Sequence, residues 1–111
     1  MEEFSIYVID FEGSLQTGIL EYGIVEVSST KGILSTETQL CKNKATISHL
    51  EQECHHLSRD KLVYCSYFED YLERFIKARS NSFFCAHNAA YENTLLSAYL
   101  PLLTTNNQQY T

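Results

Sequence analysis

The stretch IYVIDFEG, residues 6–13, places two acidic residues at the end of the first apolar run of the chain. β-Branched and aromatic residues dominate this run, which is typical of a β-strand. Side chains two residues apart on a strand point to the same face, so Asp10 and Glu12 are expected to project together. Two adjacent carboxylates repel each other unless a proton or a cation lies between them, and their oxygens suit a divalent metal ion. An isolated pair of this kind more often begins a solvated loop, so the context has to decide.

Length and composition indicate one modest globular domain. The 111 residues, of which 44% are hydrophobic and 20% charged, are enough for a single core over residues 1–111. We expect a loose polar tail at residues 104–111. No apolar run approaches the length of a membrane span, and the acidic N-terminus lacks the basic region of a secretory signal. Because the four cysteines form no C-x-x-C pair, we predict a cytoplasmic protein with free, mostly buried thiols.

The net charge of −6 argues against a nucleic-acid binder that works through a basic patch. It does not exclude a protein whose carboxylates hold divalent cations, because bound cations change the sign of the local field. The charge therefore leaves the class of ligand open.

The first half of the chain predicts three strands, at residues 4–11, 19–27 and 33–40. Their short connections favour an antiparallel meander. The first strand is apolar on both faces as far as Ile9, which predicts cover on both sides. The third strand alternates with more polar residues, so it is expected to have one solvated face and to lie near an edge.

The second half reads as helices around one short strand. The sequences SHLE at 48–51 and SYFE at 66–69 have the form of capping boxes, and they predict a short helix to about residue 54 and an amphipathic helix over 67–79. A strand at 82–86 precedes a helix over 89–100, capped by Asn88 and stopped near Pro101. Because a helical crossover favours parallel pairing, we predict an α/β layer fold with a mixed sheet.

A third acidic residue lies on the last predicted helix. Glu92 shares a stripe with Leu95, Leu96 and Tyr99, at offsets of three, four and seven residues. A carboxylate on an apolar stripe is costly unless it is paired, while its place in the first turn favours an anion. The alternative is a boundary residue that reaches solvent past Ala89.

Three segments then occur in order, namely DFE at 10–12, LEYGIVEV at 20–27 and AHNAAYE at 86–92 followed by two leucines. Together they resemble the DEDD-type 3′–5′ exonucleases, which include polymerase proofreading domains and ribonuclease T. The resemblance covers essentially the whole chain. It implies a ribonuclease-H-like fold, in which a three-strand antiparallel meander and a parallel strand are flanked by helices. It also implies Mg²⁺- or Mn²⁺-dependent hydrolysis at the 3′ end of single-stranded DNA or RNA.

The resemblance also implies roles for particular residues. Asp10 and Glu12 match the first two metal-binding acids, and Glu92 falls where the family usually has Asp, one methylene shorter. The positions matching substrate contacts are Phe11, Gly13, Asn88 and Tyr91. A complete site in the family would hold two ions about 4 Å apart and use a His as general base.

The family's last motif, a His or Tyr followed by a metal-binding Asp, has no match, because no Asp follows Asp70. We therefore expect a fragment or short copy with little activity alone. Its last apolar stripe, at residues 95, 96, 99 and 103, is expected to stay partly uncovered and to favour self-association.

Other interpretations remain beside this one. A non-catalytic binding module would keep the fold and hold one structural cation or none. An unrelated α/β domain would carry the three segments by chance. The group of His49, Cys54, His55 and His56 lacks the two separated ligand pairs of usual zinc sites, so zinc is disfavoured.

Overall fold

The computed structural model describes residues 4–81, 83–86 and 89–99. The predicted cap Asn88 and the predicted tail at 104–111 lie outside these residues. In chain order the elements are β1 (Ser5–Ser14), β2 (Gly18–Ser28), β3 (Gly32–Leu40), α1 (His49–His55), α2 (Arg59–Leu62), the 3₁₀-helix η1 (Phe68–Tyr71), α3 (Leu72–Asn81), β4 (Phe83–Cys85) and α4 (Ala89–Ser97).

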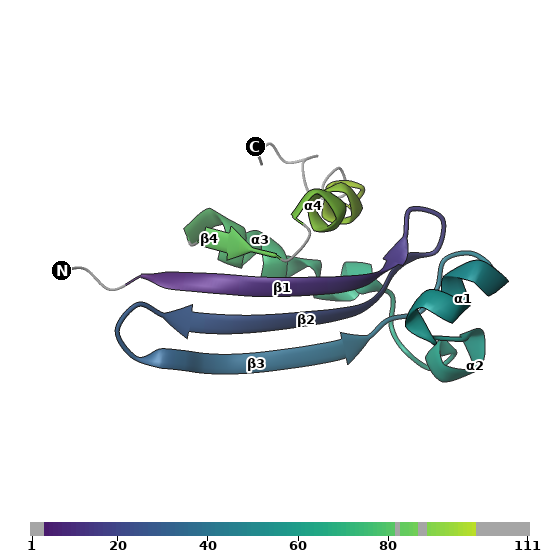
Figure 1. Ribbon diagram of the computed structural model, residues 1–111, viewed down its shortest axis with the longest axis horizontal. Helices are drawn as coiled ribbons and strands as arrows, with labels where there is room; N and C mark the ends of the chain where they lie inside the picture. The colour runs from purple at the N-terminus through teal and green to yellow at the C-terminus, as the bar shows by residue number, and fades with distance from the viewer. Residues whose placement is uncertain (1–3, 82, 87–88, 100–111) are drawn as a thin grey trace.

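The strands form one sheet in the order β3-β2-β1-β4 (Figure 1). β1 pairs with β2 and β2 with β3 in antiparallel fashion, which confirms the predicted meander and places β3 at an edge. β4 pairs in parallel with β1, and the paired residues are only 6–8 of β1 and 83–85 of β4. Among the described residues, the later part of β1 therefore has no strand partner on this side.

The main core lies on one face of the sheet, where η1, α3 and α4 pack against β1 and β2. Along β1, Ile9 and Phe11 are buried, whereas Val8 is 40% exposed and Asp10 is exposed. The prediction that the first strand is covered on both faces is therefore wrong for the described residues. β-Branched residues such as Val8 favour extended backbone even where they are half solvated, so the apolar run marked a strand without marking two buried faces.

The helices differ from the prediction mainly at their starts. The first capping box is confirmed, because the Ser48 side chain caps α1 and accepts a hydrogen bond from the Glu51 N–H. The second is wrong, since the cap residue is Tyr67 and it makes no side-chain capping bond. There the Asp70 N–H donates to the Tyr67 carbonyl at 3.0 Å, so a 3₁₀ turn precedes α3. The short helix α2 was not predicted.

The apolar stripe of α4 is covered within the chain itself. Leu95, Leu96 and Tyr99 are only 2–3% exposed and belong to the main core. The expectation of an uncovered stripe is therefore wrong at these three positions, because the helix folds back onto β1 and η1, while Leu103 lies outside the described residues. These three residues therefore give no exposed surface for the self-association that we predicted from the stripe.

The cysteines are less buried than predicted. All four are free thiols, but only Cys41 is buried; Cys65 is half-buried, and Cys54 and Cys85 are exposed. Burial, reinforced by nearby Cys65, raises the pKa of the Cys41 thiol to about 12. None of the described helices has the length and apolar character that a membrane crossing requires.

Candidate functional site

Three acidic residues lie at or next to the later half of β1. Asp10 and Glu12 lie on the same face of this strand, Asp10 exposed and Glu12 half-buried. Glu92 comes from α4, which Figure 1 shows beside β1, and is only 4% exposed. Its carboxylate accepts a hydrogen bond at 3.3 Å from the backbone N–H of Phe11, the residue between the two strand acids. Glu92 therefore points into the protein, toward the strand that carries Asp10 and Glu12.

The fold explains why a carboxylate occupies this place. β4 pairs only with residues 6–8 of β1, so the Phe11 amide lies beyond the end of that pairing. A buried amide without a partner is costly, and a carboxylate is a strong acceptor for it. Leu95 and Leu96 anchor the same helix in the core. Glu92 thus continues the hydrogen bonding of β1 where its neighbouring strand stops.

The pKa of Glu12 reflects the negative charges that lie near it. Its pKa is raised, first by burial and then by the charge of Asp10, while His55 lowers it and Glu21 and Glu92 raise it further. Glu21 stands directly opposite Glu12 in the β1–β2 ladder. Like charges in opposed positions of neighbouring strands destabilise a sheet. A cation bound here would therefore reduce the repulsion among these carboxylates.

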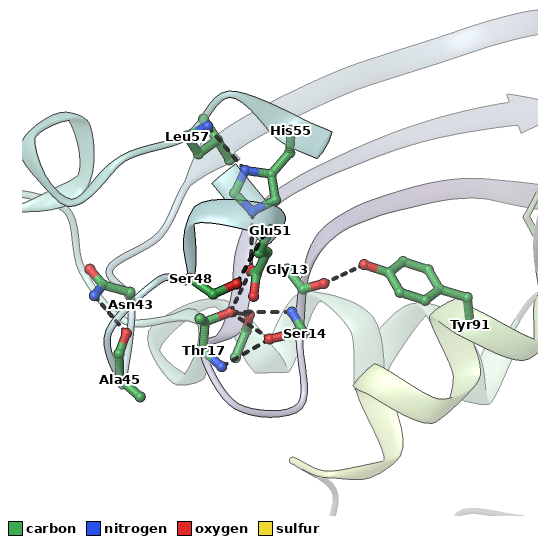
Figure 2. A network of polar contacts seen from close by, with 11 residues as sticks. Gly13, Ser14, Thr17, Asn43, Ala45, Ser48, Glu51, His55, Leu57 and Tyr91 are labelled. Atoms are coloured by element: carbon green, nitrogen blue, oxygen red, sulfur yellow. Dashed lines mark hydrogen bonds and ion pairs between the residues drawn. The ribbon is translucent and has the colours of Figure 1, made fainter. Parts of the chain in front are cut away.

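Gly13 shapes the end of β1. The pairing register shifts between Glu12 and Gly13, and Gly13 has φ of +138°, a conformation that side chains rarely adopt. A Cβ added there would lie 2.2 Å from the Gly18 carbonyl oxygen, so only glycine fits. The hydroxyl of Tyr91 donates to the Gly13 carbonyl at 2.5 Å (Figure 2).

The remaining candidates divide between core and surface. The Phe11 ring is 2% exposed and packs edge-on against Phe68 and Phe75, so it lies in the core and not where a base could stack. Tyr91 is half-buried, and its pKa is raised by burial first and by Glu12 and Glu92 next. Asn88 lies outside the described residues.

The three carboxylates have the right chemistry for a hard divalent cation, but their side chains are not arranged as a complete metal site. Asp10, Glu12 and Glu92 offer the carboxylate oxygens that Mg²⁺ and Mn²⁺ prefer. Within the described ranges, however, no three His, Cys, Asp or Glu side chains form a group that could hold a metal ion. The group of His49, Cys54, His55 and His56 likewise forms no such metal-binding group.

Three residues that the sequence did not assign to the candidate site belong to this region. Glu21 could have been found from the hairpin, because a short turn between β1 and β2 sets Glu12 and Glu21 opposite each other. Glu51 and His55, four residues apart on α1, form a largely buried hydrogen-bonded pair beside the turn. Their spacing of four residues is typical of side chains that meet on a helix. The pair of His49 and Glu53 on α1 has the same spacing, and only the fold shows which of the two pairs faces the turn.

Comparison with known proteins gives no matching family model and no matching curated protein. Solved structures do match. Exonuclease X in complex with 5′-overhanging duplex DNA is 21% identical, with a TM-score of 0.69 over 96% of this chain and 68% of that one. E. coli exonuclease I in complex with a dT13 oligonucleotide has a TM-score of 0.72 at 9% identity over 88% of this chain. Exonuclease I from Methylocaldum szegediense has a TM-score of 0.67 at 12% identity over 83% of this chain.

The chain has an exonuclease-like fold. At these identities the likeness concerns the fold alone. The chain spans 24% of the length of E. coli exonuclease I and 22% of the Methylocaldum enzyme, so the activities of those whole proteins are not carried over directly.

Proposed function

We propose that this chain carries the site of a metal-dependent 3′–5′ exonuclease of the DEDD type, on a ribonuclease-H-like fold, which acts on single-stranded nucleic-acid ends. The observation that carries the proposal is the contact of Glu92 with β1 between Asp10 and Glu12, across 81 positions of sequence. Two exonucleases with a similar fold are in complex with DNA, which supports a nucleic-acid ligand. The free thiols support a cytoplasmic location.

Each residue has a defined task in this proposal. Asp10, Glu12 and Glu92 would hold Mg²⁺ or Mn²⁺, with side-chain adjustment to complete the ligand set. A divalent cation so bound would neutralise phosphate charge and supply an activated water. The protein's own contribution is to hold Glu92 against β1 and to fix the backbone after Glu12 through Gly13 and its bond from Tyr91.

Calorimetry with Mn²⁺ tests the proposal. We expect the wild type to bind Mn²⁺ and Asp10→Ala to lose that binding, and since Asp10 is exposed the variant should fold normally. Asp60→Ala, at an exposed acid of α2, is the matched control and should bind as the wild type does. Unchanged affinity in Asp10→Ala, or no binding by the wild type, would overturn the proposal. Degradation of 3′-labelled DNA and RNA oligonucleotides then identifies the substrate.

One observation favours a second candidate, a non-catalytic binding module. The described residues form no three-ligand metal group. A module of this kind would hold one structural cation or none, and it would bind oligonucleotides or a protein without needing a divalent cation at the contact. Fluorescence anisotropy with a labelled single strand separates the two, because the exonuclease site requires Mn²⁺ for tight binding and the module does not.

A further inference from the structure

A largely buried polar network joins α1 to the turn between β1 and β2 (Figure 2). The Glu51 carboxylate accepts hydrogen bonds from the Thr17 hydroxyl at 2.9 Å and from His55 Nε2 at 3.0 Å, both on its Oε2. Thr17 is 1% exposed, and the His55 side chain is 3% exposed. Polar groups buried this deeply are expected to hold fixed partners.

The proton positions in this network follow from its donors. The Leu57 N–H donates to His55 Nδ1 at 3.0 Å, so Nδ1 carries no proton and Nε2 donates to Glu51. The Thr17 hydroxyl has one proton and three oxygen neighbours, of which the carboxylate is the strongest acceptor. Burial works to raise the pKa of Glu51, but hydrogen bonds from His55, Ser14 and Thr17 outweigh it and leave the pKa lowered. Glu51 is therefore the ionised centre of the network.

The network ends beside the candidate site. The Ser14 N–H donates to the Thr17 hydroxyl at 3.2 Å, and the Thr17 N–H donates to the Ser14 hydroxyl at 3.1 Å. Ser14 directly follows Gly13, whose carbonyl Tyr91 holds from α4. The end of β1 is thus held by α1 on one side and by α4 on the other, as Figure 2 shows.

We propose that Glu51, supported by His55, is a positioning residue that fixes the β1–β2 turn and through it the place of the Glu12 carboxylate. The metal-related part of this inference rests on the proposed function. The structure offers an internal comparison, since His49 and Glu53 form a pair at the same spacing on α1, at 2.9 Å, with 84% and 64% of their side chains exposed. An exposed pair of this kind contributes little, whereas the buried pair holds a backbone turn.

The test compares Glu51→Gln with the matched control Glu53→Gln by NMR. In Glu51→Gln we expect the amides of Ser14 and Thr17 to exchange about tenfold faster or more, and the Glu12 side-chain carboxyl resonance to shift. Glu53→Gln should change neither. In the wild type, the ¹⁵N spectrum of the His55 ring should show Nε2 protonated and Nδ1 bare.

Metal affinity supplies the readout that a merely structural role would not move. At unchanged global stability, Glu51→Gln should weaken Mn²⁺ binding by up to about tenfold, the lower end of the cost of losing a group bonded directly to a ligand, because Glu51 reaches Glu12 only through Thr17, Ser14 and the backbone. Should Glu51→Gln fail to fold, Thr17→Val and Thr17→Ser repeat the test, with Ser expected to restore what Val loses.

The outcomes separate the two proposals. A wild type that binds no Mn²⁺ refutes the exonuclease site, and the exchange rates and the Glu12 resonance still decide the positioning role. Exchange and a Glu12 resonance in Glu51→Gln that match those of Glu53→Gln would overturn the inference. So would a His55 ring protonated at Nδ1, because Leu57 could then not donate to it.

Discussion

Replacing Glu92 separates its two tasks, which are to satisfy the Phe11 amide and to provide a ligand oxygen. Glu92→Gln keeps an oxygen within reach of the Phe11 N–H, which the glutamate now accepts at 3.3 Å, but removes the negative charge. Glu92→Ala removes both the acceptor and the charge from a site that is 4% exposed. The two variants should therefore differ in stability and agree in their loss of metal response.

The magnitudes follow from the hydrogen bond and its burial. A buried amide left without an acceptor costs about 1–3 kcal/mol, so Glu92→Ala should lose that much free energy of unfolding. For a domain of this size this corresponds to roughly 4–12 °C in Tm. Glu92→Gln should lose less than about 1 kcal/mol, because an acceptor remains. Mn²⁺ at 100 times its Kd should stabilise the wild type by about 2.7 kcal/mol and neither variant appreciably.

Urea denaturation with and without Mn²⁺ measures both effects on the same samples. An alanine variant as stable as the wild type would refute the role of Glu92 as the partner of Phe11. A glutamine variant that keeps the full stabilisation by Mn²⁺ would refute its role as a ligand while leaving the structural role intact. The two results are independent, so each half of the reasoning can fail alone.

Two further predictions concern the end of β1. The raised pKa of Glu12 means that its stabilising contribution is complete below the unfolded value of 4.5 and is lost as the pH rises through the folded value. Without metal, Glu12→Gln should therefore be more stable than the wild type at pH 7 and equal to it well below pH 4.5, as urea titrations at both pH values will show. Gly13→Ala should abolish or strongly weaken folding, because the added Cβ would overlap the Gly18 carbonyl oxygen. The control Gly32→Ala lies at φ of +79° with nothing within 4 Å of the added Cβ, so it should cost only the backbone strain, about 1–3 kcal/mol. Equal thermal midpoints for the two variants would contradict the close packing at Gly13.

The sequence predicted the elements better than it predicted their surroundings. Alternation and short turns were enough for the meander, because hairpin connections leave few other topologies. Cover on both faces of the first strand was not predictable, since Val8 has the same strand propensity whether it is buried or solvated. The burial of Leu95 and Leu96 also escaped prediction, because the partner surface for a helix stripe comes from residues far away in the chain.

The candidate site shows the same division. The spacing of Asp10 and Glu12 predicted their common face, whereas the stripe of α4 left open whether Glu92 points inward or reaches solvent, and its exposure of 4% decides for the interior. The network of Glu51 and His55 depends on how α1 meets the turn after β1, a tertiary contact between residues 34 positions apart at Thr17 and Glu51. No local pattern distinguishes this pair from the exposed pair beside it.

The length of β4 connects the fold to the site. Because β4 pairs with β1 only at residues 6–8, the Phe11 amide needs another acceptor, and α4 supplies one in Glu92. The extra methylene of Glu relative to Asp gives the carboxylate a longer reach from the buried stripe of α4 to the backbone of β1. A shorter acid at this position would have to give up the Phe11 contact or draw the helix closer to the strand.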